Sequence, residues 1–288
     1  MKNEGTNQTI DTVAIVGVGL IGGSFARALR ERAGFHGRIL GVSRPEFAGA
    51  AVRAGVIDEA VTLEDAAARS GFLYLSAAIG RIAATVATLD PYLKAGALVT
   101  DAGSTKRRIM DAGAAIRRGV FVGGHPMAGK EQRGSAAADP DLFAGRTYFL
   151  TFAAEDHKQL PAVLQLRRWL GAFGANVVEI EPAAHDRLVA FTSHLGQLAS
   201  TGLALTVDRQ VAERARTGAG SGIIDMTRLA MSGWDGLWSD ILATNHDAIG
   251  AALDAYISEL QRIRANLQGD FAADFDRAAA FAAKLRKS

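Results

Sequence analysis

The first 180 residues alternate short apolar runs with segments of helical periodicity. The runs are rich in β-branched and aromatic residues, which is typical of strands, and several intervening segments repeat apolar residues every three or four positions. Strands are predicted at 12–16, 38–42, 71–76, 97–100, 120–122, 146–151 and 176–180, and helices at 25–29, 82–93 and 160–173. This alternation predicts an α/β domain of Rossmann type, with a doubly wound, mostly parallel sheet and right-handed crossovers.

The pattern changes after Pro182. From there only helical periodicity is found, broken by a glycine-rich segment at 217–222. The segment 188–207 has no formally charged residue but contains six hydroxyl or amide side chains, so it predicts a helix buried inside protein rather than a membrane span. We therefore predict a sheet domain at residues 1–181 and an all-α domain at residues 182–288.

The C-terminal tail carries an apolar stripe. Phe271, Phe275, Ala278, Ala282 and Leu285 follow one another at spacings of four and three residues, so they share one face of a helix. Together with the uncharged helix, this stripe favours a homodimer formed through the helical domain. Packing of the stripe within one chain is the alternative.

A glycine turn joins the first predicted strand to the first predicted helix. Gly17, Gly19 and Gly22 have the spacing GxGxxG. The first glycine permits a tight turn, the second lets a pyrophosphate approach a helix N-terminus, and the third lets helix and strand pack closely. With Leu20 and Ile21 between them, they are predicted to bind a dinucleotide. A structural turn in another α/β protein is the alternative.

The end of the second predicted strand indicates which dinucleotide is bound. An NAD site usually places an acidic side chain here, on the ribose 2′-hydroxyl. This chain has Ser43 and Arg44 instead, and a guanidinium beside a hydroxyl suits a 2′-phosphate. We therefore predict NADP as the cofactor, with NAD possible if Arg44 is only a solvated side chain.

Two further polar residues follow predicted strands. One is Ser104, and the other is His125, within the glycine- and proline-containing segment 123–131. This segment predicts a loop that presents the imidazole to a cleft. Because ligands bind beyond the carboxyl ends of parallel strands, we expect these residues, Ser43 and the glycine turn at one edge of the sheet. A histidine that only stabilises its loop is the alternative.

Composition excludes several classes of function. The chain has 32 basic and 30 acidic residues, and no basic run with interleaved aromatic residues, so nucleic acid is not an expected partner. The absence of cysteine excludes disulfides, thiolate metal sites and a cysteine nucleophile, and a cytoplasmic chain is the simplest interpretation. The polar residues 1–11 lack the features of a signal peptide, and no membrane partner is expected.

Five segments together resemble the prephenate/arogenate dehydrogenase family of tyrosine biosynthesis. They are 17–24, 101–106, 124–129, 193–195 and 225–230, and their order and spacing cover nearly the whole chain. The resemblance implies an NAD(P)-binding domain and a helical dimerisation domain, with the active site between them. It also implies the reaction. Hydride leaves the carbinol carbon of a cyclohexadienol for the nicotinamide, the ring carboxylate departs as CO2, and the ring becomes aromatic without a metal.

The resemblance assigns roles to individual residues. His125 is expected to accept the hydroxyl proton, because a neutral imidazole is suited to this near pH 7. Ser104 is expected to orient the hydroxyl or the histidine. The residues expected to bind the substrate or to shape its site by charge are Arg228, Thr227, His194, Lys106 and Glu131. Among them, Arg228 has the planar fork that matches a carboxylate.

Structural and functional alternatives accompany these roles. Arg228 could pair with Asp225, His194 could be a satisfied core histidine, and Ser104 could cap a helix. The chain could also be another NADP-linked dehydrogenase, of the β-hydroxyacid or imine reductase type, which would need a catalytic lysine or aspartate in the helical domain. A non-catalytic NADP-binding protein is a further alternative. Prephenate and arogenate differ by a keto or an amino group, and the sequence leaves this choice open.

Overall fold

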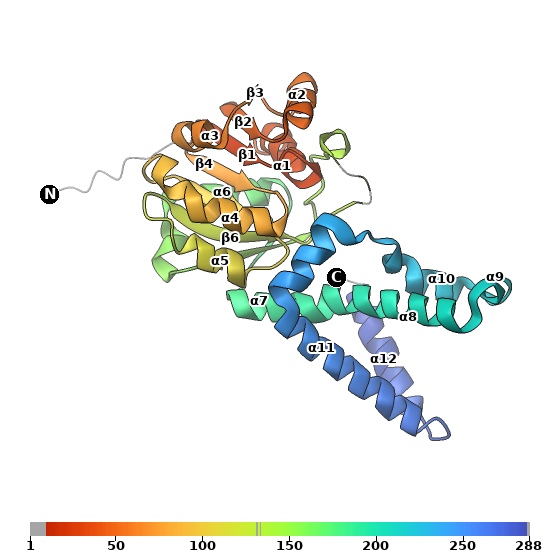
Figure 1. The fold of residues 1–288 in the computed structure, drawn as a ribbon. Helices are drawn as coiled ribbons and strands as arrows, with labels where there is room; N and C mark the ends of the chain where they lie inside the picture. The colour runs from red at the N-terminus through yellow and green to blue at the C-terminus, as the bar shows by residue number, and fades with distance from the viewer. Residues whose placement is uncertain (1–9, 131, 133, 287–288) are drawn as a thin grey trace.

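The computed structural model describes residues 10–130, 132 and 134–286, which form a sheet domain followed by a helical domain (Figure 1). Within these residues, eight strands make one sheet in the order β3-β2-β1-β4-β5-β6-β7-β8. Their bounds are Thr12–Val16 (β1), Arg38–Val42 (β2), Glu59–Ala60 (β3), Phe72–Leu75 (β4), Leu98–Asp101 (β5), Val120–Pro126 (β6), Thr147–Phe152 (β7) and Asn176–Glu179 (β8). All paired strands are parallel except β6 and β7. The predicted Rossmann-type, mostly parallel fold is confirmed, and the short β3 is an additional strand.

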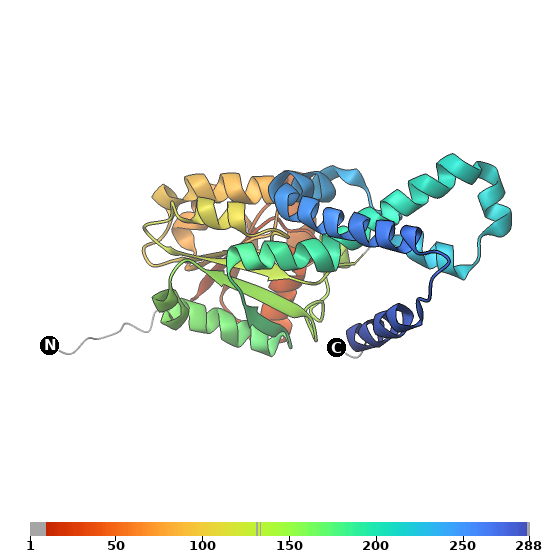
Figure 2. The same cartoon turned by 90° about the horizontal axis from the view of Figure 1, so that it is seen from below.

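Helices cover both faces of the sheet. They are α1 (Leu20–Glu31), α2 (Pro45–Arg53), α3 (Leu63–Arg69), α4 (Ile79–Leu89), α5 (Arg107–Gly113) and α6 (Pro161–Ala172). Helices α1 and α6 pack on one face, and α4 and α5 pack on the other (Figure 2). Each face buries its own apolar cluster, so the sheet lies between two separate hydrophobic layers.

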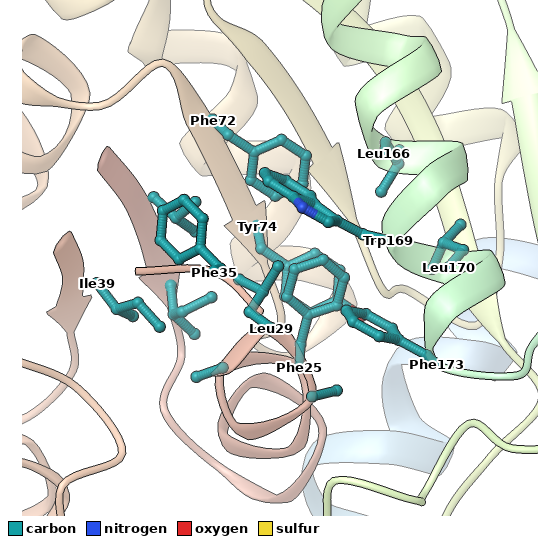
Figure 3. Close-up of a cluster of buried hydrophobic side chains, with 14 of the residues drawn as sticks. Phe25, Leu29, Phe35, Ile39, Phe72, Tyr74, Leu166, Trp169, Leu170 and Phe173 are labelled. Atoms are coloured by element: carbon teal, nitrogen blue, oxygen red, sulfur yellow. The ribbon is translucent and has the colours of Figure 1, made fainter. Parts of the chain in front are cut away.

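The layer beneath α1 and α6 is aromatic (Figure 3). Phe25 of α1 stacks on Tyr74 of β4, with ring centroids 4.0 Å apart, and Trp169 of α6 meets Phe72 of β4 edge-on at 5.1 Å. All four side chains are almost completely buried. Rings of this size contribute a large share of core stability, so this layer stabilises the sheet whose strand ends carry the site.

The segment around His125 is a strand, where the glycines predicted a loop. Strand β6 continues through Pro126, and His125 is paired with Phe149 of β7. A Cβ on Gly123 would lie 2.1 Å from the hydroxyl of Thr151, and a Cβ on Gly124 would lie 2.4 Å from a backbone carbonyl oxygen. The two glycines therefore serve close packing on neighbouring chain rather than an irregular turn.

The helical domain begins directly after the last strand. Its helices are α7 (Pro182–Val189), α8 (Leu195–Val211), α9 (Ala215–Gly218), α10 (Ser221–Thr227), α11 (Ser239–Ala265) and α12 (Ala272–Leu285), with a π-helical turn at Ala190–His194 between α7 and α8. Helix α7 packs on α5, and the first turns of α11 pack on α4. The rest of α8 and α11 extends away from the sheet (Figure 1).

Much apolar surface of the helical domain faces outward. Met231 is 86% exposed and Phe275 is 75% exposed, and α12 buries none of its residues. Large exposed apolar patches usually mark a surface that binds protein. Among the described residues, the helices are too short or too polar to cross a membrane.

Candidate active site

Three cavities adjoin one another along the carboxyl ends of the strands. The cofactor cavity lies at the glycine turn, the central cavity contains Ser104 and His125, and the outer cavity contains Arg228. The cofactor and central cavities share Ser76 and Ala77 as lining residues, and the central and outer cavities share Gly129 and Leu237. The cavities therefore form one path from the glycine turn to the helical domain.

The glycine turn has the geometry that a dinucleotide requires. Gly17 has a φ of 95°, and a Cβ there would lie 2.8 Å from the backbone of Ser76. A Cβ on Gly22 would lie 2.2 Å from the carbonyl oxygen of Gly17, so α1 and β1 pack closely. Helix α1 begins at Leu20 with Gly19 as its N-cap and no side-chain cap. Its first N–H groups are therefore open to a phosphate, and the turn fits a pyrophosphate.

Positive charge dominates the far end of the cofactor cavity. Ser43, Arg44 and Arg81 line it, and none of the described lining residues is acidic. The guanidinium of Arg44 lies over the ring of Phe47, 4.4 Å from its centroid. Glu46 is 3.6 Å from Arg44 at the exposed rim, where an ion pair contributes little and a phosphate can replace it.

The two predicted catalytic residues lie together in the central cavity. His125 is the next-to-last residue of β6, and Ser104 lies in the turn between β5 and α5. Both line this cavity with Leu20 and Ile21 from the start of α1. The structure therefore places the imidazole and the hydroxyl beside the N-terminus of the cofactor-binding helix.

Ser104 is not the cap of α5. The N–H groups of Lys106 and Arg107 donate to the carboxylate of Asp186, at 2.6 and 3.0 Å. Asp186 belongs to α7, so the helical domain supplies the cap of a helix in the sheet domain. The hydroxyl of Ser104 is consequently not used at the start of α5.

A buried ion pair supports the strand that carries His125. The Lys106 ammonium pairs with the Asp101 carboxylate, and both side chains are 0% exposed. Lys106 also donates to the carbonyl oxygen of Gly124 at 2.6 Å, and the Gly124 N–H donates to Asp101 at 2.9 Å. Burial lowers the pKa of Lys106, and the Asp101 carboxylate opposes this shift. Lys106 thus stabilises the strand that carries His125, and it lines none of the three cavities.

His125 is buried and neutral. Its Nδ1 lies 2.9 Å from Nε2 of His185, and Nδ1 of His185 lies 2.8 Å from the Asp186 carboxylate. Burial lowers the pKa of His125 well below 6.5, and the neighbouring His185 and the Lys106 cation lower it further. A neutral imidazole near pH 7 is the form that can accept a proton.

The outer cavity offers two cations. Arg228 and Lys130 both line it, with Trp238 forming part of the wall. Lys130 also pairs with Asp139 at 2.5 Å. The alternative pairing of Arg228 with Asp225 is not among the ion pairs of the described residues, and Arg228 is exposed, so the guanidinium is available to an anion.

Thr227 and Glu131, two other predicted substrate contacts, stay predictions. The hydroxyl of Thr227 donates to the carbonyl oxygen of Ile223 within α10, at 2.7 Å, and Thr227 does not line the cavity. Glu131 lies outside the described residues.

His194 is enclosed at the domain interface. It is 1% exposed, its Nδ1 is 3.3 Å from Nδ2 of Asn245, and its ring meets Trp238 edge-on at 6.0 Å. Burial lowers the pKa of His194 to about 4. Trp238 lines the outer cavity and His194 does not, so a role of His194 as a substrate contact stays a prediction.

Sequence reasoning missed the residues that meet behind His125. They are Asp101, His185, Asp186 and Asn245. An adjacent His-Asp pair just after Pro182 was a signal that could have drawn attention to α7. Asn245 carried no such signal, because its importance comes from a kink in α11 that lets its amide donate to the Asp186 carbonyl at 2.8 Å.

Comparison with known proteins identifies both domains. The family model described as "Prephenate dehydrogenase, nucleotide-binding domain" matches residues 25–179, and the one described as "Prephenate dehydrogenase, dimerization domain" matches residues 181–281. The chain is 33% identical to prephenate dehydrogenase of Bacillus subtilis over 280 residues, which cover 94% of this chain and 74% of the relative.

Solved structures agree with these matches. Prephenate dehydrogenase of Aquifex aeolicus, in complex with hydroxyphenyl propionate and NAD+, has a TM-score of 0.81 and 30% identity, covering 96% of each chain. Arogenate dehydrogenase of Synechocystis has a TM-score of 0.79 and 28% identity, covering 96% of this chain and 99% of the other. The chain belongs to the prephenate dehydrogenase family of oxidoreductases.

Proposed function

We propose that this chain catalyses the NADP-dependent oxidative decarboxylation of prephenate, of arogenate, or of both, in tyrosine biosynthesis. The observation that carries the proposal is the position of His125. It is a buried, neutral imidazole in a cavity that adjoins a dinucleotide-binding turn on one side and an arginine-lined cavity on the other. A base, a hydride acceptor and a carboxylate-binding group are the parts that this reaction needs.

The chemistry can be assigned to individual groups. When bound, the dinucleotide supplies the hydride acceptor. His125 Nε2 accepts the hydroxyl proton while hydride leaves the carbinol carbon, and Ser104 orients the hydroxyl. The electrons of the bond to the departing CO2 then complete the aromatic ring. Arg228 binds a carboxylate of the substrate, and Lys130 in the same cavity adds positive charge for a second one.

The NADP preference rests on the cofactor cavity. Ser43, Arg44 and Arg81 present a hydroxyl and two guanidinium groups where an NAD site has a carboxylate for the ribose. A 2′-phosphate would pair with these cations, whereas the uncharged 2′-hydroxyl of NAD gains less from them.

The alternative dehydrogenase of β-hydroxyacid or imine reductase type is disfavoured by the central cavity. That chemistry needs a catalytic lysine or aspartate from the helical domain. The described helical-domain residues that line the cavity are Gly236 and Leu237, and neither has a titratable side chain.

We also propose that the chain divides at residue 181 and that residues 182–288 form a homodimer interface. The exposed apolar side chains of α12, with Phe275 and Phe281 among them, support this proposal. Replacing Phe275 and Phe281 together by aspartate should give a monomer in analytical ultracentrifugation. A wild-type chain that sediments as a monomer would contradict it.

Initial rates test the reaction and the cofactor together. Prephenate and arogenate are each assayed with NAD and with NADP, for the wild type and for His125→Asn. The variant should lose on the order of 10² to 10⁴ in kcat, because general base catalysis is removed, while its affinity for NADP stays unchanged. Failure of the wild type to turn over either cyclohexadienol would contradict the proposed reaction, and full activity of the variant would contradict the role of His125.

A further inference from the structure

Three buried side chains form a row that leads away from the central cavity. His125 of β6, His185 of α7 and Asp186 of α7 are 8%, 0% and 1% exposed. Their polar atoms are 2.9 Å apart at the first contact and 2.8 Å apart at the second. Both distances are those of ordinary hydrogen bonds. Because Nδ1 of His125 is used in the row, Nε2 is the nitrogen left for the cavity.

The Asp186 end of the row can only accept hydrogen bonds. Its carboxylate accepts from His185 and from the backbone N–H groups of Lys106 and Arg107. Burial alone would raise the pKa of Asp186, but the hydrogen bonds from His185, Arg107 and Lys106 outweigh it and the pKa is lowered. Asp186 is therefore an anion, and Nδ1 of His185 must carry the proton between them.

The proton on His185 determines the proton on His125. Burial lowers the pKa of His185, and the hydrogen bond to Asp186 opposes this only in part, so the ring is neutral at pH 7. A neutral imidazole has one N–H group, which faces Asp186, and its Nε2 is an acceptor. Nδ1 of His125 must then be the donor in the contact with His185.

From these contacts we propose that His185 and Asp186 are positioning residues, which fix His125 in the tautomer with a proton on Nδ1 and a free electron pair on Nε2. The inference deepens the proposed function and rests on His125 as the base. In the reaction step the substrate O–H bond breaks and a bond from that proton to Nε2 forms. The other two protons of the row stay in place, and Asp186 offsets the charge that His125 gains.

The same carboxylate also orients the other predicted catalytic residue. Through the N–H groups of Lys106 and Arg107, Asp186 holds the turn in which Ser104 lies. Asn245 of α11 donates to the Asp186 carbonyl oxygen, so a third element fixes this residue. One side chain of the helical domain thus sets the positions of two groups in the sheet domain.

The tautomer can be measured without turnover. The chain has six histidines, so imidazole 15N spectra of selectively labelled protein are simple, and the ring that disappears in His125→Asn identifies His125. The wild type should show Nδ1 protonated and Nε2 unprotonated at pH 7. A ring of His125 protonated at Nε2 would overturn the proposal, whatever the kinetics show.

Two substitutions of His185 separate positioning from packing. In His185→Gln, the amide can donate to Asp186 and accept from His125, so the polarity of both hydrogen bonds is kept. In His185→Leu, the acceptor is lost. We expect kcat of His185→Leu to fall on the order of a hundredfold, with KM changed by less than about threefold and with mixed His125 tautomers, and kcat of His185→Gln to recover most of this loss.

Thr244→Val is the matched control. Thr244 is buried at the same interface and is 2.8 Å from the hydroxyl of Thr105, outside the row. It should retain kcat and the tautomer of the wild type. Equal activity of His185→Leu and wild type would overturn the proposal, as would equal losses in the Leu and Gln variants. Turnover retained by His125→Asn would instead refute the base assignment, while the 15N spectrum would still decide on the tautomer.

Discussion

The site has an inner half and an outer half that differ in how their charges are held. The inner half consists of Asp101, Lys106, His125, His185 and Asp186, none more than 8% exposed and each with a polar partner within hydrogen-bond distance. The outer half consists of the exposed cations Arg44, Lys130 and Arg228. Buried charges and polar groups need fixed partners. Exposed ion pairs, such as those of Arg44 with Glu46 and Lys130 with Asp139, contribute little and can be exchanged for a ligand.

The difference indicates a division of labour. The inner half is arranged before a ligand binds, so it should determine the rate of the chemical step. The outer half should determine which anions are bound and how tightly, because its side chains can move to meet carboxylate or phosphate groups. Substitutions in the two halves should accordingly affect different quantities.

Lys106→Met should have the largest effect, on folding rather than on binding. It leaves the Asp101 carboxylate fully buried without its cation, which typically costs about 3–5 kcal/mol of unfolding free energy. Urea unfolding followed by circular dichroism measures the loss. Arg32→Met is the control, since it breaks the exposed ion pair with Asp141 and should cost much less. Equal losses in the two variants would contradict the distinction between buried and exposed charges.

The buried histidines should make stability depend on pH. The pKa of His194 falls from 6.5 to about 4 through burial, so between these values the unfolded chain binds more protons than the folded chain. The contribution of His194 to the unfolding free energy is therefore fully present above pH 6.5. It is lost as the pH falls toward 4, by about 3 kcal/mol for this group alone. The lowered pKa values of His125 and His185 act in the same direction.

Unfolding free energies at pH 7 and pH 5 test this dependence. His194→Gln should reduce the difference between the two values. His36→Gln replaces an exposed histidine and should keep the wild-type difference. A wild-type protein equally stable at both pH values would show that the buried histidines His125, His185 and His194 are not held neutral by burial.

The sequence was informative where local geometry or sheet topology determines position. The glycine turn is a local structure, because Gly17 and Gly22 are required by contacts within β1 and α1 and the adjoining strand. Ser104 and His125 were expected beside it because the carboxyl ends of parallel strands share one edge. Both line the cavity next to that turn.

The contacts within the inner half could not be predicted in the same way, because they join distant parts of the chain. His125 and His185 are 60 residues apart, and Lys106 meets Asp186 across 80 residues. The glycines before His125 predicted a loop, but Gly124 is required by close packing. A Cβ on Gly124 would lie 2.4 Å from the carbonyl oxygen of Asp101, and this contact exists only in the folded sheet. Lys106 was expected to shape the substrate site by its charge, but it is fully buried and pairs with Asp101.

In the outer half, Arg228→Ala should act on binding. Loss of a charge-assisted contact to a carboxylate should raise the KM for prephenate by about 10- to 100-fold, with a smaller change in kcat. Arg228→Lys should recover part of the loss, because it keeps the charge but not the planar fork. A variant that loses kcat while keeping KM would place Arg228 with the inner half.

Arg44→Ala should have the smallest effect, and this effect should be seen with NADP but not with NAD. The side chain is 67% exposed and pairs weakly with Glu46, so its contact with a 2′-phosphate is partly screened by water. We expect the Kd for NADP to rise about 5- to 10-fold and the Kd for NAD to change by less than twofold, measured by fluorescence titration. Arg81→Ala, in the same cavity, shows whether the second guanidinium shares the phosphate. A wild-type protein that binds NAD more tightly than NADP would contradict the assignment of the cofactor. The roles proposed for the inner half would still stand, since none of its five residues lines this cavity.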